Sequence, residues 1–388
     1  MELELVLTKD SMQRPEGADW SLPQITTEMG AIPMLPKNGR RQHVAPVALV
    51  TKNPAAIKIR SDQLTYRILL GLLEGKYYTQ VPTHCCAEYR QTLPKGRGYV
   101  ILAFSPRGKE SWRQVQSTLA LLGDEIVDTF LALLAVALDS NGTERISLPF
   151  EISVDDILAL CQKKKSKGSY PAHQRLKVIE YVQALARVSV RTTFMLRDGK
   201  QWYVESPVLE VLVNEWEIYP GHKSQCSWQL KIGDWAVMLP QLQSQTSVIS
   251  RQVLHYHARK QKYQKRLGRY LTVLYRINAH RHGGRVKVSM GMLLEHAGIA
   301  LDRDNPGRTR DAIERALDQL HADGVIGSFG PSVERSSRGQ EVQERIEQHA
   351  YHWWDTYRRQ LWLFELPAYL KAAYQDSRRE HQEGEKPD

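Results

Sequence analysis

One order of predicted elements occurs twice in this 388-residue chain, and it restricts the fold more than any other feature of the sequence. In each copy, apolar periodicity predicts a first helix, a short strand that leads into a second helix, a third helix, and then two strands. The copies run through residues 125–213 and 269–366, and Ser153 of the first corresponds to Ser289 of the second. The repeat therefore predicts two units of one α+β fold.

Three helices followed by a β-hairpin, with a short strand before the second helix, is the arrangement of the winged helix-turn-helix. We therefore predict an α+β protein with two tandem winged-helix domains and a flexible, proline-rich N-terminal arm. The expected divisions are the arm over 1–60, a mixed segment over 61–108, the first winged-helix domain over 109–240, a basic linker and second winged-helix domain over 241–370, and a charged tail over 371–388.

The charge of the chain favours a polyanionic partner. The formal net charge is +10, and the stretch between Asp234 and Glu295 holds eleven Lys and Arg but no acidic residue. Such an excess attracts nucleic acid or, less commonly, an anionic membrane surface. The most apolar run contains Asp124, Glu125 and Asp128, which is too much charge for a membrane span. The N-terminus lacks the pattern of a signal peptide, so we expect a soluble cytoplasmic protein.

The sequence shows no motif for catalysis, metal or cofactor binding that is specific enough to predict an enzyme. No GxxxxGK[ST] phosphate-binding loop occurs. The cysteines lack the spacing of a zinc site or of a disulfide framework; they are Cys85, Cys86, Cys161 and Cys226. We therefore expect a non-enzymatic protein without metal or cofactor.

The third helix of the first copy, residues 171–186, follows a loop rich in lysine. A cationic loop that leads into a helix N-terminus suits phosphate, because free backbone N–H groups add to the lysine charge. The periodicity assigns Leu176 to the core and Tyr181 to the outer face. The predicted backbone contacts are Lys163, Lys164, Lys165, Lys167, His173 and Lys177. The alternative is that the lysines only solubilise a turn.

The third helix of the second copy opens at Asn305 and Pro306. Recognition helices present their N-terminal residues to base edges, and arginine contacts guanine through two hydrogen bonds. We therefore predict base contact by Arg308 or Arg310. The alternative is a solvated face on which charges pair, such as Asp311 with Arg315.

The stretch HYHARKQKYQKRLGRY, within the acid-free window, is predicted to follow the DNA backbone between the two docked units. If about ten cations of the window met phosphates, the affinity would fall by several decades over a modest rise in salt concentration. The predicted contacts in this stretch are Arg259, Lys260, Lys262, Lys265, Arg266 and Arg269.

Residues 110–370 resemble the plasmid replication initiators (Rep proteins) that are built from tandem winged helices. The resemblance rests on the duplicated unit, on WQLKIGDWAVML after the first wing, on the acid-free linker, and on RTRDAIERALDQLHADGVIGSF followed by LWLFELP. The N-terminal arm and the long stretch 331–359 inside the second hairpin have no match in the family pattern.

This resemblance implies that the C-terminal winged helix reads repeated origin sites (iterons) in the major groove. The N-terminal one would contact DNA less specifically and serve as a dimer interface. On the same resemblance, Arg308, Thr309, Arg310 and Arg315 are the specific readers. The neighbouring site is held by His173, Arg175, Lys177 and the lysine run.

The expected function is therefore a sequence-specific, double-stranded DNA-binding initiator of replication for a plasmid or similar replicon. Its candidate partners are origin repeats, host helicase or initiator proteins, and a second copy of the chain. The alternative is a winged-helix transcriptional regulator that binds a single palindrome. Less favoured is a rolling-circle-type nicking initiator that would use His255, His257 and Tyr263, because no further metal ligand lies nearby in the sequence.

Overall fold

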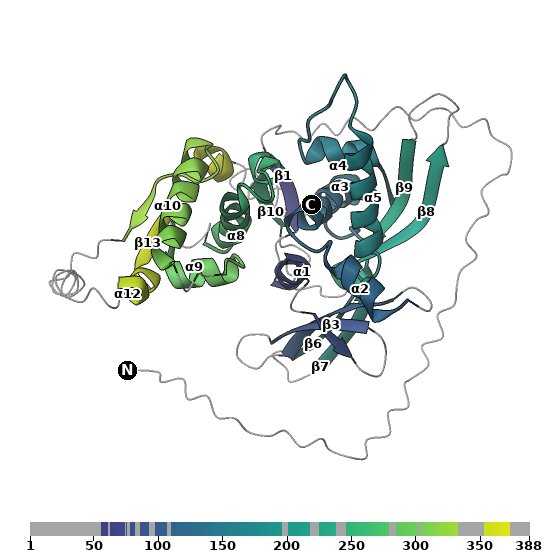
Figure 1. The fold of residues 1–388 in the computed structure, drawn as a ribbon, viewed down its shortest axis with the longest axis horizontal. Coiled ribbons are helices and arrows are strands. Elements are labelled where there is room, and N and C mark those ends of the chain that lie inside the picture. Colours follow the sequence, from purple (N-terminus) through teal and green to yellow (C-terminus); the bar gives the residue numbers. More distant parts are fainter. Residues whose placement is uncertain are drawn as a thin grey trace, which may run out of the picture. The chain divides into compact units, whose positions relative to one another are not determined.

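The structure is a computed structural model, and its described residues all belong to one compact unit, Leu49–Asp388. It describes residues 56–60, 63–73, 75, 78–81, 86–92, 98–106, 110–195, 201–217, 225–237, 246–278, 285–300, 302, 305–332 and 353–372. These residues form helices and antiparallel sheets, which confirms the predicted α+β class (Figure 1). Within the described ranges, no helix has both the length and the apolar character needed to cross a membrane. Most of the predicted arm and tail, residues 1–55 and 373–388, lies outside them.

The first repeated unit contains three helices and a three-stranded antiparallel sheet. Its strands lie in the order β5-β9-β8, so the last strand in sequence is central. Ser153 begins the second helix with a capping box, in which its hydroxyl accepts from the Asp156 N–H and the Asp156 carboxylate accepts from the Ser153 N–H. In chain order the elements are α3 (Asp124–Asn141), β5 (Phe150–Ser153), α4 (Val154–Leu160), α5 (Ala172–Leu185), β8 (Leu209–Glu217) and β9 (Gln225–Ile232).

The second repeated unit has a similar order, apart from two further strands between α5 and β8 in the first unit and a short helix between the last two strands of the second. Its sheet order, β11-β13-β12, again places the last strand in the centre. Ser289, at the position that corresponds to Ser153, caps the second helix by accepting from the Met292 N–H. The elements are α8 (Lys262–Asn278), β11 (Arg285–Ser289), α9 (Met290–His296), α10 (Pro306–Ala322), β12 (Phe329–Pro331) and β13 (Leu361–Glu365).

The hairpin predicted as the first wing forms, but it belongs to another sheet, so that prediction is wrong. It consists of β6 (Val188–Met195) and β7 (Gln201–Pro207), and β6 pairs on its other side with β4 (Gly98–Phe104). Together with β2 (Thr79–Val81) and β3 (Cys86–Thr92) they make a five-stranded sheet. Pro207 is the last residue of β7, and one further hydrogen bond joins the Val208 N–H to the Val188 carbonyl oxygen, at 2.7 Å. The pair β8 and β9 instead completes the sheet that begins with β5.

Two predicted boundaries change as a result. Residues 61–108, expected as a separate segment, supply three strands of the sheet that holds the hairpin. The end of the predicted arm is a strand, β1 (Ala56–Arg60), which pairs with β10 (Thr246–Ser250). The predicted basic linker likewise folds into β10, α7 (Arg251–His255) and the first turns of α8.

Helix α3 is the core of the first unit, because side chains on all of its faces are buried from Ile126 to Leu138. Helix α1 (Gln63–Leu73), β1 and α5 pack against it. In the second unit α8 has the same place, with α10 and β10 packed against it. Each third helix, α5 or α10, therefore rests on the first helix of its own unit.

Candidate nucleic-acid interface

The lysine run forms a small ordered hairpin between α4 and α5. Ser166 and Ser169 exchange both backbone hydrogen bonds, at N···O distances of 2.7 and 3.1 Å. Lys167 and Gly168 form its tip, with φ angles of 49° and 79°. Positive φ at both central residues defines the tight turn that suits a two-residue hairpin. The side chains of Lys164, Lys165 and Lys167 are exposed, so the tip presents cations to solvent.

On α5, the predicted DNA contacts His173 and Lys177 are exposed, but Arg175 is not free. The Nε and Nη2 of Arg175 donate to the two carboxylate oxygens of Asp155 on α4, at 2.7 and 2.6 Å. These hydrogen bonds raise the pKa of Arg175. A guanidinium held in this way positions α5 against α4, and the contact of Arg175 with DNA stays a prediction.

The core face of α5 is rotated relative to the prediction. Leu176 is 56% exposed, whereas Tyr181 is buried. The burial of Tyr181 is possible because its hydroxyl donates to Glu125 on α3, at 2.5 Å. Burial alone would raise the pKa of Glu125, but this hydrogen bond and the nearby Lys163 and Lys177 lower it. Lys163 and Lys177, predicted DNA contacts, lie 3.9 and 3.8 Å from the Glu125 carboxylate.

Three of the six cations predicted along the linker are buried, so their assignment to DNA is wrong. Lys265, Arg266 and Arg269 are 0, 4 and 7% exposed and pair with carboxylates of α3. These three cations of the acid-free window thus form ion pairs with α3, which precedes them by more than a hundred residues in the sequence. The exposed cations of the stretch are Arg259, Lys260 and Lys262.

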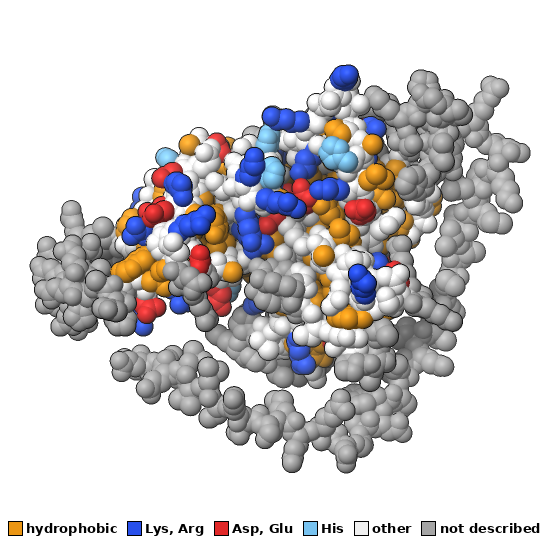
Figure 2. Space-filling view, in the orientation of Figure 1, with side chains coloured by type: hydrophobic (Ala, Val, Ile, Leu, Met, Phe, Trp, Pro, Cys, Tyr) orange, Lys and Arg blue, Asp and Glu red, His pale blue; other side chains and the backbone are white. Residues whose placement is uncertain are grey.

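Cationic side chains nevertheless gather on one face of the molecule. In Figure 2, Lys, Arg and His side chains concentrate over the region that holds α4, β10 and the start of α8 in Figure 1. A hydrogen bond ties the lysine hairpin to this region: the Nδ1 of His255 on α7 lies 2.7 Å from the Oε1 of Gln162. We call the exposed cations of the hairpin tip and of the start of α8 and the loop before it the basic surface; they are Lys164, Lys165, Lys167, Arg259, Lys260 and Lys262.

The residues considered for nicking are not arranged around a metal. The Nδ1 of His257 accepts from the backbone N–H groups of Arg259 and Lys260, at 3.1 and 3.3 Å. Tyr263 is partly buried against the core. Across the part of the chain that the structure describes, no three His, Cys, Asp or Glu side chains are grouped so that they could hold a metal ion.

Helix α10 presents a mixed charged face. The Asn305 side chain caps it by accepting from the Arg308 N–H at 3.1 Å, and Pro306 fits the first turn. Arg308 and Arg315 are exposed. Thr309 is only 4% exposed and faces the core with Ile313 and Leu317, so its prediction as a base reader is corrected.

Arg310 is held from three sides. It donates to Asp311 at 3.0 Å, lies 4.0 Å from Glu314, and its guanidinium carbon is 5.2 Å from the ring centre of Trp353. Trp353 opens α12 (Trp353–Arg359), a helix within the stretch predicted as a long wing. The aromatic contact and the two acids orient Arg310 along the flank of α10. Sequence periodicity gave no signal for this contact.

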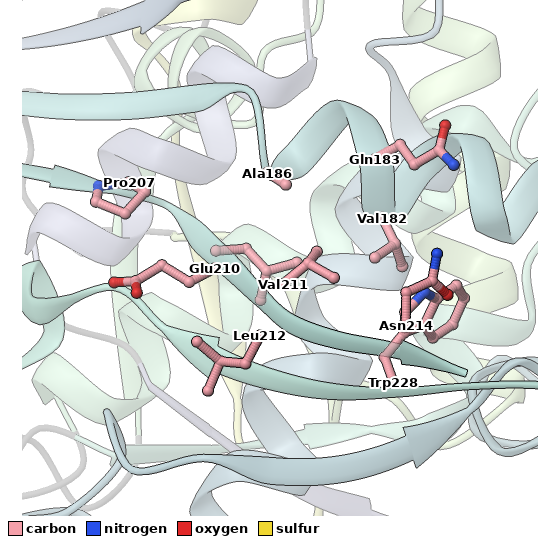
Figure 3. A pocket seen from close by; sticks show the side chains of 10 residues that line it. Val182, Gln183, Ala186, Pro207, Glu210, Val211, Leu212, Asn214 and Trp228 are labelled. Atoms are coloured by element: carbon pink, nitrogen blue, oxygen red, sulfur yellow. The ribbon is translucent and has the colours of Figure 1, made fainter. Parts of the chain in front are cut away.

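A groove runs between α5 and the edge strand β8 (Figure 3). Val182 of α5 and Ala186, which follows that helix, line one side, and Val211 of β8 lines the other. Leu212 is the extra residue of a β-bulge, since Val211 and Val213 pair with consecutive residues of β9. Val211, Leu212 and Val213 are 38, 44 and 42% exposed. An apolar edge of this kind suits contact with protein rather than with phosphate.

The fold and this surface define an α+β protein with two repeated units and a basic face. No protein-family model matches the chain, and no curated protein matches it. Among solved structures, a crystal structure of domains 2 and 3 of RctB aligns over 65% of this chain and 83% of that one, with a TM-score of 0.40 and 10% sequence identity. A TM-score of that size does not establish a common fold.

Proposed function

We propose that this protein is a non-enzymatic, sequence-specific double-stranded DNA-binding protein built from two tandem winged helices, and that it initiates replication of a plasmid or similar replicon. The observation that carries the proposal is the repeat: in both units a helix, a strand, two helices and two strands of one sheet follow in that order, with β6 and β7 inserted in the first unit and α12 in the second. Both sheets place the last strand between the first and the second. This order supports a helix-turn-helix with a β-hairpin wing in each unit.

Helix α10 is the proposed recognition helix. Its exposed Arg308 lies in the first turn, and the exposed Arg315 donates through its Nε to the Asp311 carbonyl oxygen of the same helix, at 3.0 Å. Arginine on such a face pairs with guanine, and a carboxylate such as Asp311 accepts from the amino group of cytosine. The alternation of both charges supports base reading more than uniform attraction to phosphate.

The lysine hairpin of the first unit, together with the cations before α8, is proposed to hold the DNA backbone. Lysine side chains at the tip of a hairpin are flexible point charges, which suit phosphate contacts that position a protein without reading sequence. The exposed His173 and Lys177 on α5 lie in the same unit. This division assigns positioning to the first unit and reading to the second.

The cellular role is proposed on the likeness to plasmid initiators noted in the sequence. The protein would act in the cytoplasm, bind directly repeated origin sites and recruit host helicase or initiator proteins. The apolar edge of β8 supports association with a second copy. A transcriptional regulator of the same fold would protect one palindrome, whereas an initiator protects direct repeats.

Footprinting on the DNA that flanks the gene tests the proposal. We expect protection of direct repeats, and we expect Arg308→Ala with Arg315→Ala to weaken binding to a repeat by at least about tenfold, because each bidentate contact contributes about 1–3 kcal/mol. Arg113→Ala on α2 (Trp112–Leu119) removes an exposed arginine elsewhere and serves as the matched control. Unchanged binding by the double variant would contradict the assignment of α10.

A plasmid-relaxation assay separates the nicking alternative. We expect supercoiled plasmid to stay intact with Mg²⁺ or Mn²⁺ and the protein. Open circles that disappear with Tyr263→Phe would instead support a nicking initiator.

A further inference from the structure

The first helices of the two units are joined by a buried cluster of charged side chains. Asp124 and Asp128 of α3 face Lys265, Arg266 and Arg269 of α8, and all five are 7% exposed or less. We call these five residues the α3–α8 cluster. Buried ionic groups are costly to leave unpaired, so their arrangement fixes how α3 and α8 can pack.

The contacts in the cluster interlock. Asp124 accepts from Arg269 Nη1 at 2.6 Å and from Arg266 Nε at 3.0 Å, and its carbonyl oxygen accepts from Arg269 Nη2 at 2.8 Å. Asp128 accepts from Arg269 as well, and from Lys265 Nζ at 2.5 Å. Arg269 therefore contacts two successive turns of α3. These contacts fix the position of α8 along the axis of α3 as well as the distance between the two helices.

Lys265 extends the cluster to a third helix. Its Nζ donates to Asp128 and to the carbonyl oxygens of Val253 and Leu254 on α7, at 3.1 and 2.9 Å for the two carbonyls. All three partners are acceptors, and only a protonated ammonium has three N–H groups to donate. Lys265 is thus a charged, fully bonded residue between α3, α7 and α8.

A continuous packed path connects the two third helices through this cluster. Helix α5 packs on α3, the cluster joins α3 to α8, and α10 packs on α8. Two more connections join the units. Strand β1 packs on α3 and pairs with β10, which packs on α8. The Tyr66 hydroxyl of α1 donates to the His296 carbonyl oxygen of α9. None of these links passes through a loose linker.

We propose that the α3–α8 cluster fixes the distance and angle between α5 and α10, and thereby sets the spacing between the DNA segments that the two units contact. This inference rests on the proposed function for its DNA consequence, but not for the coupling itself. Asp124, Asp128, Lys265 and Arg269 are then spacing determinants that never touch DNA.

The coupling is measured without DNA by electron–electron spin distances. Nitroxides are attached at Glu180→Cys on α5 and Asp318→Cys on α10, both exposed positions. The native Cys86, Cys161 and Cys226 are buried, and Cys85→Ser removes the remaining thiol. We expect one narrow distance distribution, and a broad one for Asp128→Asn. A broad distribution in the otherwise unaltered protein overturns the proposal.

The matched control is Asp155→Asn. It breaks an ion pair of the same chemistry, with Arg175, inside the first unit. We expect the control to keep the narrow distribution. If Asp128→Asn folds with an unchanged circular dichroism spectrum and stays equally narrow, the cluster does not set the orientation.

The DNA consequence is tested with the protected site found by footprinting. Inserting about five base pairs between the segments that the two units protect turns one by roughly half a helical turn relative to the other. We expect this insertion to weaken binding by the unaltered protein by about tenfold or more. An insertion of about ten base pairs should also weaken it, because the distance changes, whereas Asp128→Asn should tolerate both better.

The two proposals fail differently. If the unaltered protein binds its site equally well at every spacing, the spacing role is overturned even where Asp128→Asn does not fold. If no specific site exists but the spin distances are narrow, the proposed function fails and the coupling stands.

Discussion

The Nζ of Lys265 lies 2.5 Å from the Oδ2 of Asp128, although the two residues are 137 positions apart in the sequence. Asp128 interrupts the most apolar run of the sequence, and Lys265 belongs to the window that lacks acids. Each is unusual in its own segment, and the fold brings the two together with both side chains buried. Part of the positive charge of α8 therefore stabilises the fold and is not available to a ligand.

Lys265→Ala should lower the free energy of unfolding by about 3–5 kcal/mol, because it leaves a buried carboxylate with fewer partners. Urea denaturation followed by circular dichroism measures the change. Lys260→Ala, five residues away and exposed, should alter stability by less than about 0.5 kcal/mol. Equal effects of the two substitutions would show that the pair does not stabilise the fold.

Acid should destabilise the protein in part through Glu125. Although burial raises its pKa, the Tyr181 hydrogen bond and Lys163 and Lys177 lower it below the ordinary value of 4.5. A lowered carboxyl pKa adds stability above the unfolded value, and that stability is lost as the pH falls through the folded value. Tyr181→Phe should therefore make the loss between about pH 5 and pH 3 smaller.

Urea midpoints at several pH values test this expectation. Tyr170→Phe is the control, because the Tyr170 hydroxyl donates to no carboxylate among the described residues. If the urea midpoint falls with pH equally in Tyr181→Phe and in the unaltered protein, Glu125 does not contribute to the acid destabilisation.

The salt dependence of DNA binding should reflect only the exposed cations. Lys260→Ala should reduce the slope of log affinity against log salt concentration by about one, as expected for one phosphate contact. Gel-shift titrations over a range of NaCl concentrations measure the slope, with Arg113→Ala as control. If Lys260→Ala changes the slope no more than the control, the loop before α8 does not contact phosphate.

Gly233→Ala should destabilise the first unit. A Cβ at this position would lie 1.7 Å from the Pro207 carbonyl oxygen, a backbone atom that cannot swing aside. We expect a loss of about 1–3 kcal/mol or more in the free energy of unfolding. Gly330→Ala, where a Cβ meets nothing within 4 Å, is the control. A neutral Gly233→Ala would mean that β9 and β7 can separate.

Leu212→Glu should shift the protein toward the monomer if the edge of β8 mediates self-association. The substitution places a charge in the middle of three exposed aliphatic residues, which disfavours edge-to-edge contact. Sedimentation velocity at several concentrations measures the state. Leu148→Glu is matched, because Leu148 is 47% exposed but lies outside β8. Equal sedimentation of both variants and the unaltered protein would exclude this edge as the contact.

The local signals in the sequence predicted much of the fold. Periodicity located α3, α5 and α10, and the hydroxyl residues Ser153 and Ser289 stand where the second helices begin. These features depend on side chains three or four residues apart, which a sequence displays directly.

Pairing between distant segments could not be predicted in the same way. Strand β6 has the alternation of a wing, yet alternation does not say whether its partner is β4 or β9. The sequence also does not show the partner of Arg269. Its charge suits phosphate, but in the fold it pairs with two carboxylates of α3. For the site, the exposure of Arg308 followed from its place on the first turn, whereas the anchoring of Arg310 by Trp353 did not.

Strand β1 cannot find its partner while the chain is being made until β10 has emerged, almost two hundred residues later. Contacts between such distant segments slow folding. During that interval the side of α3 that β1 covers lacks the support of the completed two-stranded sheet. The covering of α3 is therefore complete only after residues 246–250 have been made, and a chain that ended before β10 would leave β1 without its partner strand.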